Sequence, residues 1–389
     1  MRFFTVFRKT LREMSRDPWV LGLTLAFAPF FVFTYWIWFY GGSTSYTVLV
    51  LNHDVGAPLS GGEMFHAGEE IIQAITGVTY ADGKPLLKAN RLGDRAEAQS
   101  ILRNRGAAAF IEIPADFSAA LAAQKNGDRS IQVRISFGGD LTNPYYSVGA
   151  MLALTAVESY VQDFTEQQPL IQYSEEPLGA SGVRSEFEVY VPGVIVFAVI
   201  LLVFQAAMTV AREIETGALR RLQLTPMTAL DLTGGITAAL VLVGVFSILL
   251  TFGTAAALGF HSQGPVWVAV LVGAVTSLSV IGIGMVVACF SRTVSQAFVV
   301  ANFPLGLMMF FSGAIFPMPK VSLFTLGQHD LGLYDFLPPT HGVAALNKVL
   351  TIGASLDEVA FELTALLVLS LIYFAAGAWL FQRRHLSLA

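Results

Sequence analysis

Long hydrophobic runs, separated by shorter polar stretches, mark one segment near the start of the chain and most of its second half. The runs comprise residues 19–40, 189–211, 232–258, 265–290, 294–316 and 359–381. A helix needs about 20 apolar residues to cross a bilayer core roughly 30 Å thick, and it satisfies its own backbone hydrogen bonds there. The pattern therefore predicts an α-helical polytopic membrane protein with six transmembrane helices. The first helix is expected at 18–40, because Asp17 and Pro18 are typical of a helix start.

The residues before the first run alternate between apolar and basic positions at helical spacing. The apolar positions are Phe3, Phe7, Leu11 and Met14, and the basic positions are Arg8, Lys9, Arg12 and Arg16. This pattern predicts that residues 1–17 form an amphipathic cytoplasmic interface helix. A cleaved signal peptide is the alternative, but the run at 19–40 is long and aromatic and no small-residue cleavage site follows it.

Basic residues collect at the ends of the hydrophobic runs. They precede the first run, and those that follow the second, fourth and sixth runs are Arg212, Arg220, Arg221, Arg292, Arg383 and Arg384. Cytoplasmic loops hold the excess of Lys and Arg. These groups fall on one side only if the chain crosses the membrane six times with both termini inside. We therefore expect a multi-pass protein of the bacterial inner membrane, with residues 41–188 outside.

Residues 41–188 have a different texture, with short apolar runs between helical patterns. Strands are predicted at 46–51, 107–113 and 130–137, and helices at 63–75, 94–103, 117–124 and 144–164. Asp116 is expected to cap the helix at 117–124. This alternation predicts an inserted extracytoplasmic α/β domain at 41–188, followed by transmembrane helices 2–6 within 189–389.

Composition excludes an ordinary soluble enzyme, and the sequence predicts no disulfide, metal site or nucleotide-binding loop. Hydrophobic residues make up 54% and charged residues 13% of the 389 positions, whereas a soluble domain has roughly a quarter charged. Cys289 is the only cysteine, so no disulfide forms within the chain. His66 and Glu69 have helical spacing but no evident third ligand, so no metal site is predicted. The chain also lacks a G-x-x-x-x-G-K-[ST] loop for nucleotide phosphates.

The predicted spans contain few polar groups. An ion-driven carrier needs titratable groups inside its spans, and only Glu362, near the outer start of the sixth run, is of this kind. The pattern therefore weighs against a proton-coupled carrier. Gln205 and Asn302 could line a pathway or equally hydrogen-bond a neighbouring helix.

The cytoplasmic connection at 212–229 is short and strongly charged. Thr225 and Pro226 are typical of the start of the helix that becomes the third span. The segment is either a rigid element that passes a push from a soluble partner into the membrane or a solvated turn that anchors topology. The residues alone leave both interpretations open.

The outer connection at 317–352 contains four prolines that divide it into pieces too short to cross the membrane. Thr340 is expected to cap a helix at 341–350. We expect short re-entrant or interfacial helices that close the pathway from outside, with a plain outer loop as the alternative.

Several stretches resemble, in order along nearly the whole chain, the ABC-2 type transporter permease family. In the membrane half they are Pro192-Gly193, Arg212-Glu213-x-Glu215-x-Gly217-x-Leu219, Leu224-Thr225-Pro226, Phe311-Ser312-Gly313-x-x-Phe316-Pro317 and Leu337-Pro338-Pro339-Thr340-His341-x-x-x-Ala345-Leu346. In the outer segment they are Val48-Leu49-Val50-Leu51-Asn52-His53-Asp54, Ala109-Phe110-Ile111-Glu112-Ile113-Pro114-Ala115-Asp116-Phe117-Ser118 and Gly139-Asp140-Leu141-Thr142-Asn143. The outer stretches resemble the subgroup with a large extracytoplasmic domain between the first and second transmembrane helices. One departure is Gly217-Ala218, where the family usually has Gly-Thr.

The resemblance implies a permease subunit of an ATP-binding cassette exporter for a hydrophobic or amphipathic solute. It implies no catalytic site and no cofactor in this chain, with ATP and Mg²⁺ held by separate ABC ATPase subunits. The residues it assigns to coupling with the ATPase are Arg212, Glu213, Glu215, Gly217, Leu219, Arg220 and Arg221. The pathway and outer-gate candidates are Gln205, Asn302, Phe311, Ser312, Gly313, Phe316, Pro317, Pro339, Thr340 and His341.

The expected partners are the ATPase subunits, a second permease subunit that is identical or a paralogue, membrane lipid and a periplasmic adaptor, with no nucleic acid. The main alternative is a membrane-anchored sensor or scaffold that binds a ligand through the outer domain without transport. A membrane-embedded enzyme is a weaker alternative, because the predicted spans show no cluster of polar residues.

Overall fold

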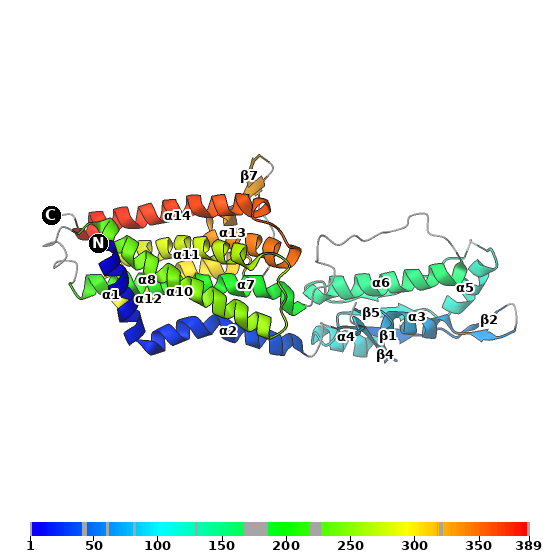
Figure 1. Ribbon diagram of the computed structural model, residues 1–389. Coiled ribbons are helices and arrows are strands. Elements are labelled where there is room, and N and C mark those ends of the chain that lie inside the picture. Colours follow the sequence, from blue (N-terminus) through cyan, green and yellow to red (C-terminus); the bar gives the residue numbers. More distant parts are fainter. Residues whose placement is uncertain are drawn as a thin grey trace. The chain divides into compact units, whose positions relative to one another are not determined.

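The computed structural model describes residues 2–40, 45–59, 62–80, 83–128, 131–166, 186–217, 227–316, 318, 322–327 and 329–386. The chain forms two compact units (Figure 1). The helical unit contains residues 1–39 and 177–389, and the α/β unit contains residues 40–176. Each unit has its own hydrophobic core.

Within the described residues, the helical unit has six helical spans that are long and apolar enough to cross a membrane, as the hydrophobic runs predict. They are α2 (Pro18–Tyr40), α7 (Glu186–Ile200) with α8 (Leu202–Glu215), α10 (Ala229–Ala257), α11 (Val266–Cys289), α12 (Val294–Phe311) and α14 (Ala360–Phe381). Helices α7 and α8 act as one 29-residue span, Phe187–Glu215, which extends beyond the predicted end at residue 211. Helix α12 ends at Phe311 rather than at residue 316, because Gly313 turns the chain with φ +81°.

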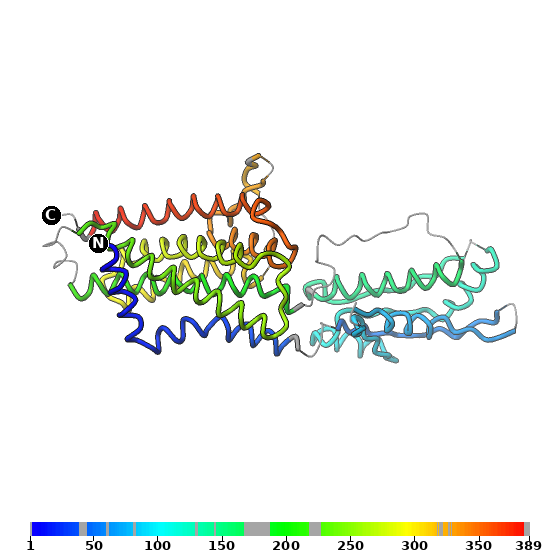
Figure 2. Tube along the Cα trace, in the orientation of Figure 1, coloured from blue at the N-terminus to red at the C-terminus, as the bar shows by residue number. Residues whose placement is uncertain are grey.

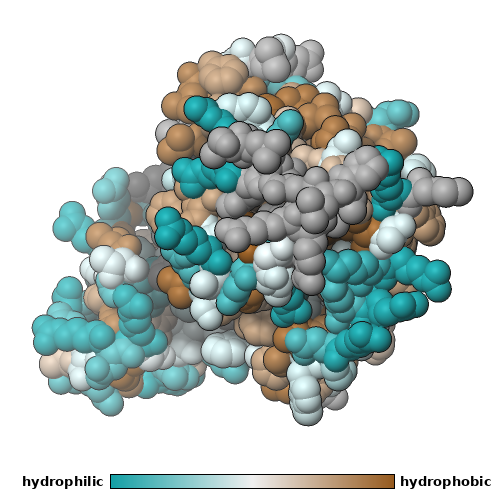
Figure 3. Space-filling model, turned by 90° about the vertical axis from the view of Figure 1, so that its left-hand side faces the viewer, coloured by the Kyte–Doolittle hydropathy of each residue, from teal (hydrophilic) through white to brown (hydrophobic). Residues whose placement is uncertain are grey.

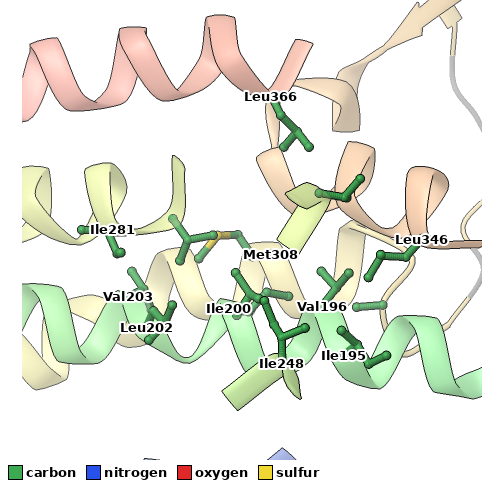
Figure 4. Close-up of a cluster of buried hydrophobic side chains, with 14 of the residues drawn as sticks. Ile195, Val196, Ile200, Leu202, Val203, Ile248, Ile281, Met308, Leu346 and Leu366 are labelled. Carbon is green, nitrogen blue, oxygen red and sulfur yellow. The ribbon is translucent and has the colours of Figure 1, made fainter. Parts of the chain in front are cut away.

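The span formed by α7 and α8 is the centre of the helical unit. In the most apolar 18-residue stretch of this span, 78% of the residues are buried, against 11% in the matching stretch of α2, 17% in α12 and 22% in α14. Figure 4 shows Ile195, Val196, Ile200, Leu202 and Val203 of this span facing side chains from the surrounding helices. Helices α2, α12 and α14 therefore present broad apolar faces to whatever surrounds the unit.

The short elements of the helical unit lie mainly between α12 and α14. They are β7 (Ser322–Leu326), β8 (His329–Gly332), η2 (Leu333–Phe336), α13 (Pro338–Asn347), η3 (Lys348–Ile352) and η4 (Asp357–Val359), with η5 (Gln382–Leu386) after α14. The β7–β8 hairpin has no counterpart in the sequence prediction. Helix α13 begins at Pro338, not at residue 341, and Thr340 does not cap it, because the Thr340 hydroxyl donates to the carbonyl oxygen of Tyr334 at 2.7 Å.

The N-terminal helix α1 (Arg2–Arg16) forms as predicted, and its buried residues are not among the predicted apolar positions. Val6 and Thr10 are its buried residues, whereas Phe3 and Phe4 are 41% and 67% exposed. Val6 is buried because Gly235 of α10 has no side chain, which lets α1 approach the backbone of α10 closely. A Cβ added at Gly235 would lie 2.7 Å from Val6 Cβ. Figure 2 shows α1, in blue, running across the direction of the long helices before the chain turns into α2.

The α/β unit is a four-stranded sheet with the strand order β4-β1-β5-β6. Its strands are β1 (Tyr46–Asn52), β4 (Leu87–Leu92), β5 (Ala109–Ile113) and β6 (Ser136–Gly138), of which only β6 is antiparallel to its neighbour. A small hairpin joins β2 (Ala57–Pro58) to β3 (Met64–Phe65). Helices α3 (Ala67–Thr76), α5 (Phe117–Lys125) and α6 (Pro144–Thr165) cover one face of the sheet, and α4 (Arg95–Arg103) covers the other.

The α/β unit departs from the sequence prediction in three places. Strand β4 was not expected, because its sequence is polar, and it lies at the sheet edge with most side chains outside the core. The strand expected at 130–137 is reduced to β6 within the described residues. Asp116 makes no side-chain cap for α5, because a carboxylate from another segment occupies that helix end, as described below.

Candidate functional site

The last turn of α8 carries a buried carboxylate. Glu213 is 6% exposed, and its Oε1 accepts a 2.6 Å hydrogen bond from Lys9 Nζ of α1. Its Oε2 has no partner among the described residues. A charge buried in protein requires a counter-charge, so this ion pair fixes α8 to α1.

The other acidic residue of this turn contacts a different helix. Glu215 Oε2 accepts a 2.7 Å hydrogen bond from the backbone N–H of Val294, the first residue of α12. A carboxylate at a helix N-terminus satisfies an unpaired N–H and interacts favourably with the helix dipole. Glu213 and Glu215 thus attach a single helical turn to α1 on one side and to α12 on the other.

The chain leaves α8 through a left-handed residue. Gly217 has φ +66° and follows the C-cap Thr216, a position that favours glycine because a Cβ there is strained. Arg212 is exposed on the same turn. The remaining coupling candidates, Leu219, Arg220 and Arg221, and the expected start at Thr225-Pro226 lie outside the described residues.

The pathway candidate Gln205 holds two helices together. Its Nε2 donates a 2.6 Å hydrogen bond to Thr24 Oγ1 of α2, which is the helix-to-helix alternative raised by the sequence. Gln205 also lines a small cavity of about 70 Å³, walled by α1, α2 and α8, together with Glu13, Asp17 and Arg212. This cavity is polar at its α1 wall and lies beside the Glu213 turn.

The exposed face of α12 carries the other pathway candidate. Asn302 is exposed, and its amide donates back to the carbonyl oxygen of Phe298 at 2.9 Å. Around it, Val299 and Phe303 are 68% and 75% exposed. A largely apolar face that carries the Asn302 amide is suited to contact with lipid, with a second subunit or with an apolar solute.

The motif after α12 forms a tight turn against α7. Ser312 is buried, and its Oγ accepts a hydrogen bond from the N–H of Ala314 at 3.3 Å. The carbonyl oxygen of Ala314 would lie 2.2 Å from a Cβ at Gly193, so only glycine at that position admits the turn. Phe316 is 58% exposed, and Pro317 lies outside the described residues.

The second motif of the outer connection packs on this turn. Phe311 stacks on Tyr334 with ring centroids 5.2 Å apart. His341 is 5% exposed, and its Nε2 lies 2.9 Å from the carbonyl oxygen of Asp335. Pro339 is buried as well, so α13 is a packed helix rather than part of a plain loop. The Pro192-Gly193, Phe311–Phe316 and Leu337–Leu346 motifs therefore meet in one place, which we call the outer cluster.

One ion pair of the outer connection was not foreseen. Glu362 of α14 is 6% exposed, and its Oε1 accepts a 2.6 Å hydrogen bond from Lys348 Nζ of η3. The sequence suggests water near Glu362, whereas the structure buries it against the outer connection. The only available signal was that Lys348 is one of two basic residues predicted in the outer parts of the membrane half.

In the α/β unit, the two outer motifs meet at Asp54. Its carboxylate accepts hydrogen bonds from Ser118 Oγ at 2.5 Å, from Ser118 N at 2.9 Å and from Gly68 N at 3.0 Å. Burial acts to raise the pKa of Asp54, but the hydrogen bonds from Ser118, Gly68 and Gly56 outweigh burial and lower it. One anion thus satisfies the N-termini of both α3 and α5, which is a structural role.

The α/β unit also contains an open groove of about 480 Å³ between α5, α6 and the segment that leads into β6. Its walls are mostly apolar and include Leu121, Phe137 and Val157. Gln124 and Glu158 add polar groups. In the described part of the chain, no group of three or more His, Cys, Asp or Glu side chains could hold a metal ion.

The end of the helical unit that carries α1, the last turn of α8 and η5 is viewed directly in Figure 3, where hydrophilic side chains gather beside hydrophobic ones. In Figure 1, α13 and the β7–β8 hairpin lie at the opposite end of this unit. A sequence profile for a family described as "ABC-2 family transporter protein" matches residues 18–379. No curated protein matches the chain.

Proposed function

Because the chain belongs to the ABC-2 family of transporter proteins, we propose that it is the permease subunit of an exporter for a hydrophobic or amphipathic solute. It is a multi-pass membrane protein, and its family comprises the transmembrane components of ABC systems. Such components have no ATPase site of their own and associate with ABC ATPase subunits. In the proposed complex, the ATPase subunits hold ATP and Mg²⁺, and this chain binds no cofactor.

The double attachment of the last turn of α8 carries the proposal. Glu213 connects this turn to α1, and Glu215 connects it to the first residue of α12. In this proposal, a push on the 213–224 segment, which begins in this turn, reaches α8, α1 and α12 at once. When the ATPase subunits close on ATP, α8 and α12 move together, and the exposed face of α12 changes its position.

The proposed pathway forms between two permease subunits, identical or paralogous. Helix α12 is 17% buried inside the unit and carries Asn302 on an exposed apolar face, which is suited to line a path for an apolar solute. The outer cluster closes this path, because Phe311 at the end of α12 stacks on Tyr334 of η2, whose carbonyl oxygen accepts a hydrogen bond from Thr340 of α13. A shift of α12 moves this turn and opens the gate.

The proposed orientation places both termini and the Glu213 turn in the cytoplasm of a bacterial cell and the α/β unit outside the inner membrane. Arg2, Arg8, Lys9, Arg12 and Arg16 of α1 support this orientation. The proposal assigns the chain to the family subgroup with a large extracytoplasmic domain, which is the α/β unit, and gives this unit a surface for a periplasmic adaptor. No nucleic acid partner is proposed.

The alternative function is a membrane-anchored sensor or scaffold. The 480 Å³ groove of the α/β unit favours it, because an apolar groove with a few polar groups is typical of a ligand site. This alternative predicts ligand binding to the purified chain but no ATPase subunit in the complex.

The test begins with gentle extraction of the complex from its native membrane, identification of the ATPase subunit and reconstitution into liposomes that contain a lipophilic dye. Glu215→Lys removes the carboxylate that binds the start of α12 and places a positive charge at a helix N-terminus. We expect ATP hydrolysis to continue while ATP-dependent dye movement falls at least tenfold.

Glu97→Lys is the matched control, because Glu97 is an exposed residue of α4 in the α/β unit and changes the charge equally. We expect it to transport like the unmodified chain. Absence of any ATPase subunit from the extracted complex would contradict the proposed function, and normal dye movement with Glu215→Lys would contradict the role of this turn.

A further inference from the structure

Helix α1 has a shallow, strongly basic hollow on the side away from α10. Phe4, Thr5, Arg8, Lys9 and Arg12 line it, and its volume is about 620 Å³. Positions 4, 8 and 12 lie one above another at helical spacing, with 5 and 9 beside them. The hollow is therefore a single face of one helix, with an aromatic ring at one end and two guanidinium groups along it.

The charges on this face are not balanced by ion pairs in the part of the chain that the structure describes. Among the described residues, neither the Arg8 nor the Arg12 guanidinium takes part in an ion pair, and Lys9, which pairs with Glu213, is still 42% exposed. Like charges one helical turn apart repel each other. Two exposed arginines in this arrangement favour an external anion, and their planar donor groups match phosphate oxygens.

The place of the hollow in the molecule specifies the source of the anion. Only Asp17 separates α1 from α2, and α1 runs across the direction of α2, so α1 lies at the membrane surface when α2 crosses the bilayer (Figure 2). Phe4 is 67% exposed beside the arginines, and Trp19, at the start of α2, is 82% exposed. Exposed aromatic rings next to basic groups are suited to the headgroup region, where acyl chains and phosphates meet.

We propose that the hollow of α1 binds the phosphate headgroup of an anionic phospholipid in the leaflet on which α1 lies. Arg8 and Arg12 bind the phosphate oxygens, and Phe4 contacts the first methylene groups of the acyl chains. The basic residues of α1 then bind a specific ligand, in addition to their effect on the orientation of the chain in the membrane. The proposal concerns lipid recognition and holds whether or not the chain transports a solute.

The experiment is a lipid titration of the purified full-length chain in detergent, followed by native mass spectrometry. The probes are phosphatidylglycerol and, as the zwitterionic comparison, phosphatidylcholine with the same acyl chains. We expect tighter binding of phosphatidylglycerol by the unmodified chain. Because each basic residue near an anionic surface contributes about 1 kcal/mol, Arg8→Gln with Arg12→Gln should weaken phosphatidylglycerol binding about 30-fold.

Lys88→Gln with Arg103→Gln is the matched control, since it removes two exposed basic residues from the α/β unit. This control should bind phosphatidylglycerol like the unmodified chain. A second variant, Arg8→Lys with Arg12→Lys, keeps the charge and loses the planar guanidinium groups. Its affinity for phosphatidylglycerol should lie between that of the unmodified chain and that of Arg8→Gln with Arg12→Gln.

Three outcomes would overturn the proposal. The first is equal binding of the two lipids by the unmodified chain. The second is a loss of phosphatidylglycerol affinity in the control as large as that in Arg8→Gln with Arg12→Gln. The third is unchanged phosphatidylglycerol binding by Arg8→Gln with Arg12→Gln, and a simultaneous loss of a co-purified protein would then assign the hollow to a protein partner.

Discussion

Replacing Lys9 by Met removes the partner of a buried carboxylate. Glu213 is 6% exposed, and its Oε1 accepts a 2.6 Å hydrogen bond from Lys9 Nζ. Removal of one partner from a fully buried pair costs about 3–5 kcal/mol. Lys9 itself is 42% exposed, so water reaches this pair from one side and reduces the cost. We expect the free energy of unfolding of the helical unit to fall by about 2–3 kcal/mol.

The reverse substitution is expected to be milder. Glu213→Gln leaves a neutral amide in the buried position, while the exposed Lys9 ammonium turns to water, so the loss is about 1 kcal/mol. The double variant should lose little more than Glu213→Gln alone, because no unpaired charge remains buried. The two effects are therefore strongly non-additive, as expected for residues in direct contact.

The assay is thermal unfolding of the purified chain in detergent, followed by its intrinsic tryptophan fluorescence. A loss of about 2–3 kcal/mol corresponds to a fall in the unfolding midpoint of about 5–10 °C for a unit of this size. If Lys9→Met lowered the midpoint no more than Glu213→Gln, or if the two changes were simply additive, the account of this ion pair would be refuted.

Three further predictions concern two glycines of the helical unit and the Asp54 carboxylate of the α/β unit. Gly193→Ala places a Cβ 2.2 Å from a carbonyl oxygen of the outer turn, so thermal unfolding should show a loss of about 1–3 kcal/mol, whereas Gly22→Ala, with no atom within 4 Å, should be neutral or slightly stabilising. Gly217→Ala forces a side chain into φ +66° and should cost about 1 kcal/mol in the same assay, with Gly217→Asn less affected. Asp54→Asn should cost about 1–2 kcal/mol at neutral pH. Because the pKa of Asp54 is lowered in the folded chain, the difference between the unmodified chain and Asp54→Asn in a pH series should be complete above the ordinary value of about 4 and disappear as pH falls through the lowered pKa.

The spans are the part of the fold that sequence predicts well. Lipid demands a continuous apolar helix, and this requirement leaves a strong local signal. Where a span ends depends on single residues within that signal. Gly313 stops α12 five residues before the apolar pattern ends, since Phe316 is still apolar but already lies beyond the turn.

Elements whose position depends on distant partners were not predictable in the same way. Strand β4 is polar in sequence and becomes a strand only because the edge of β1 pairs with it. The packed face of α1 is set by Gly235, more than 200 residues away, which lets Val6 approach α10. The sequence pattern alone favours Phe3, Phe7, Leu11 and Met14, of which Phe3 is exposed and the other three are only half-buried.

The candidate site follows the same division. The motifs indicate that Glu213 and Glu215 belong to an important segment, yet their roles differ because of contacts with Lys9 and Val294 that no local pattern encodes. The outer cluster combines three motifs through Gly193, whose neighbour lies 121 positions later in the chain, at Ala314. Sequence therefore identifies the segments, and tertiary contacts assign the task of each side chain.

The most direct test of the account is the side of the membrane on which the last turn of α8 lies. Cys289 is the only cysteine and is buried, so Cys289→Ser gives a background for single cysteines. In spheroplasts treated with a membrane-impermeant maleimide, Glu97→Cys should be labelled at once and Thr216→Cys only after the membrane is permeabilised. Labelling of Thr216→Cys in intact spheroplasts would contradict the account, because an ATPase in the cytoplasm could then not reach this turn.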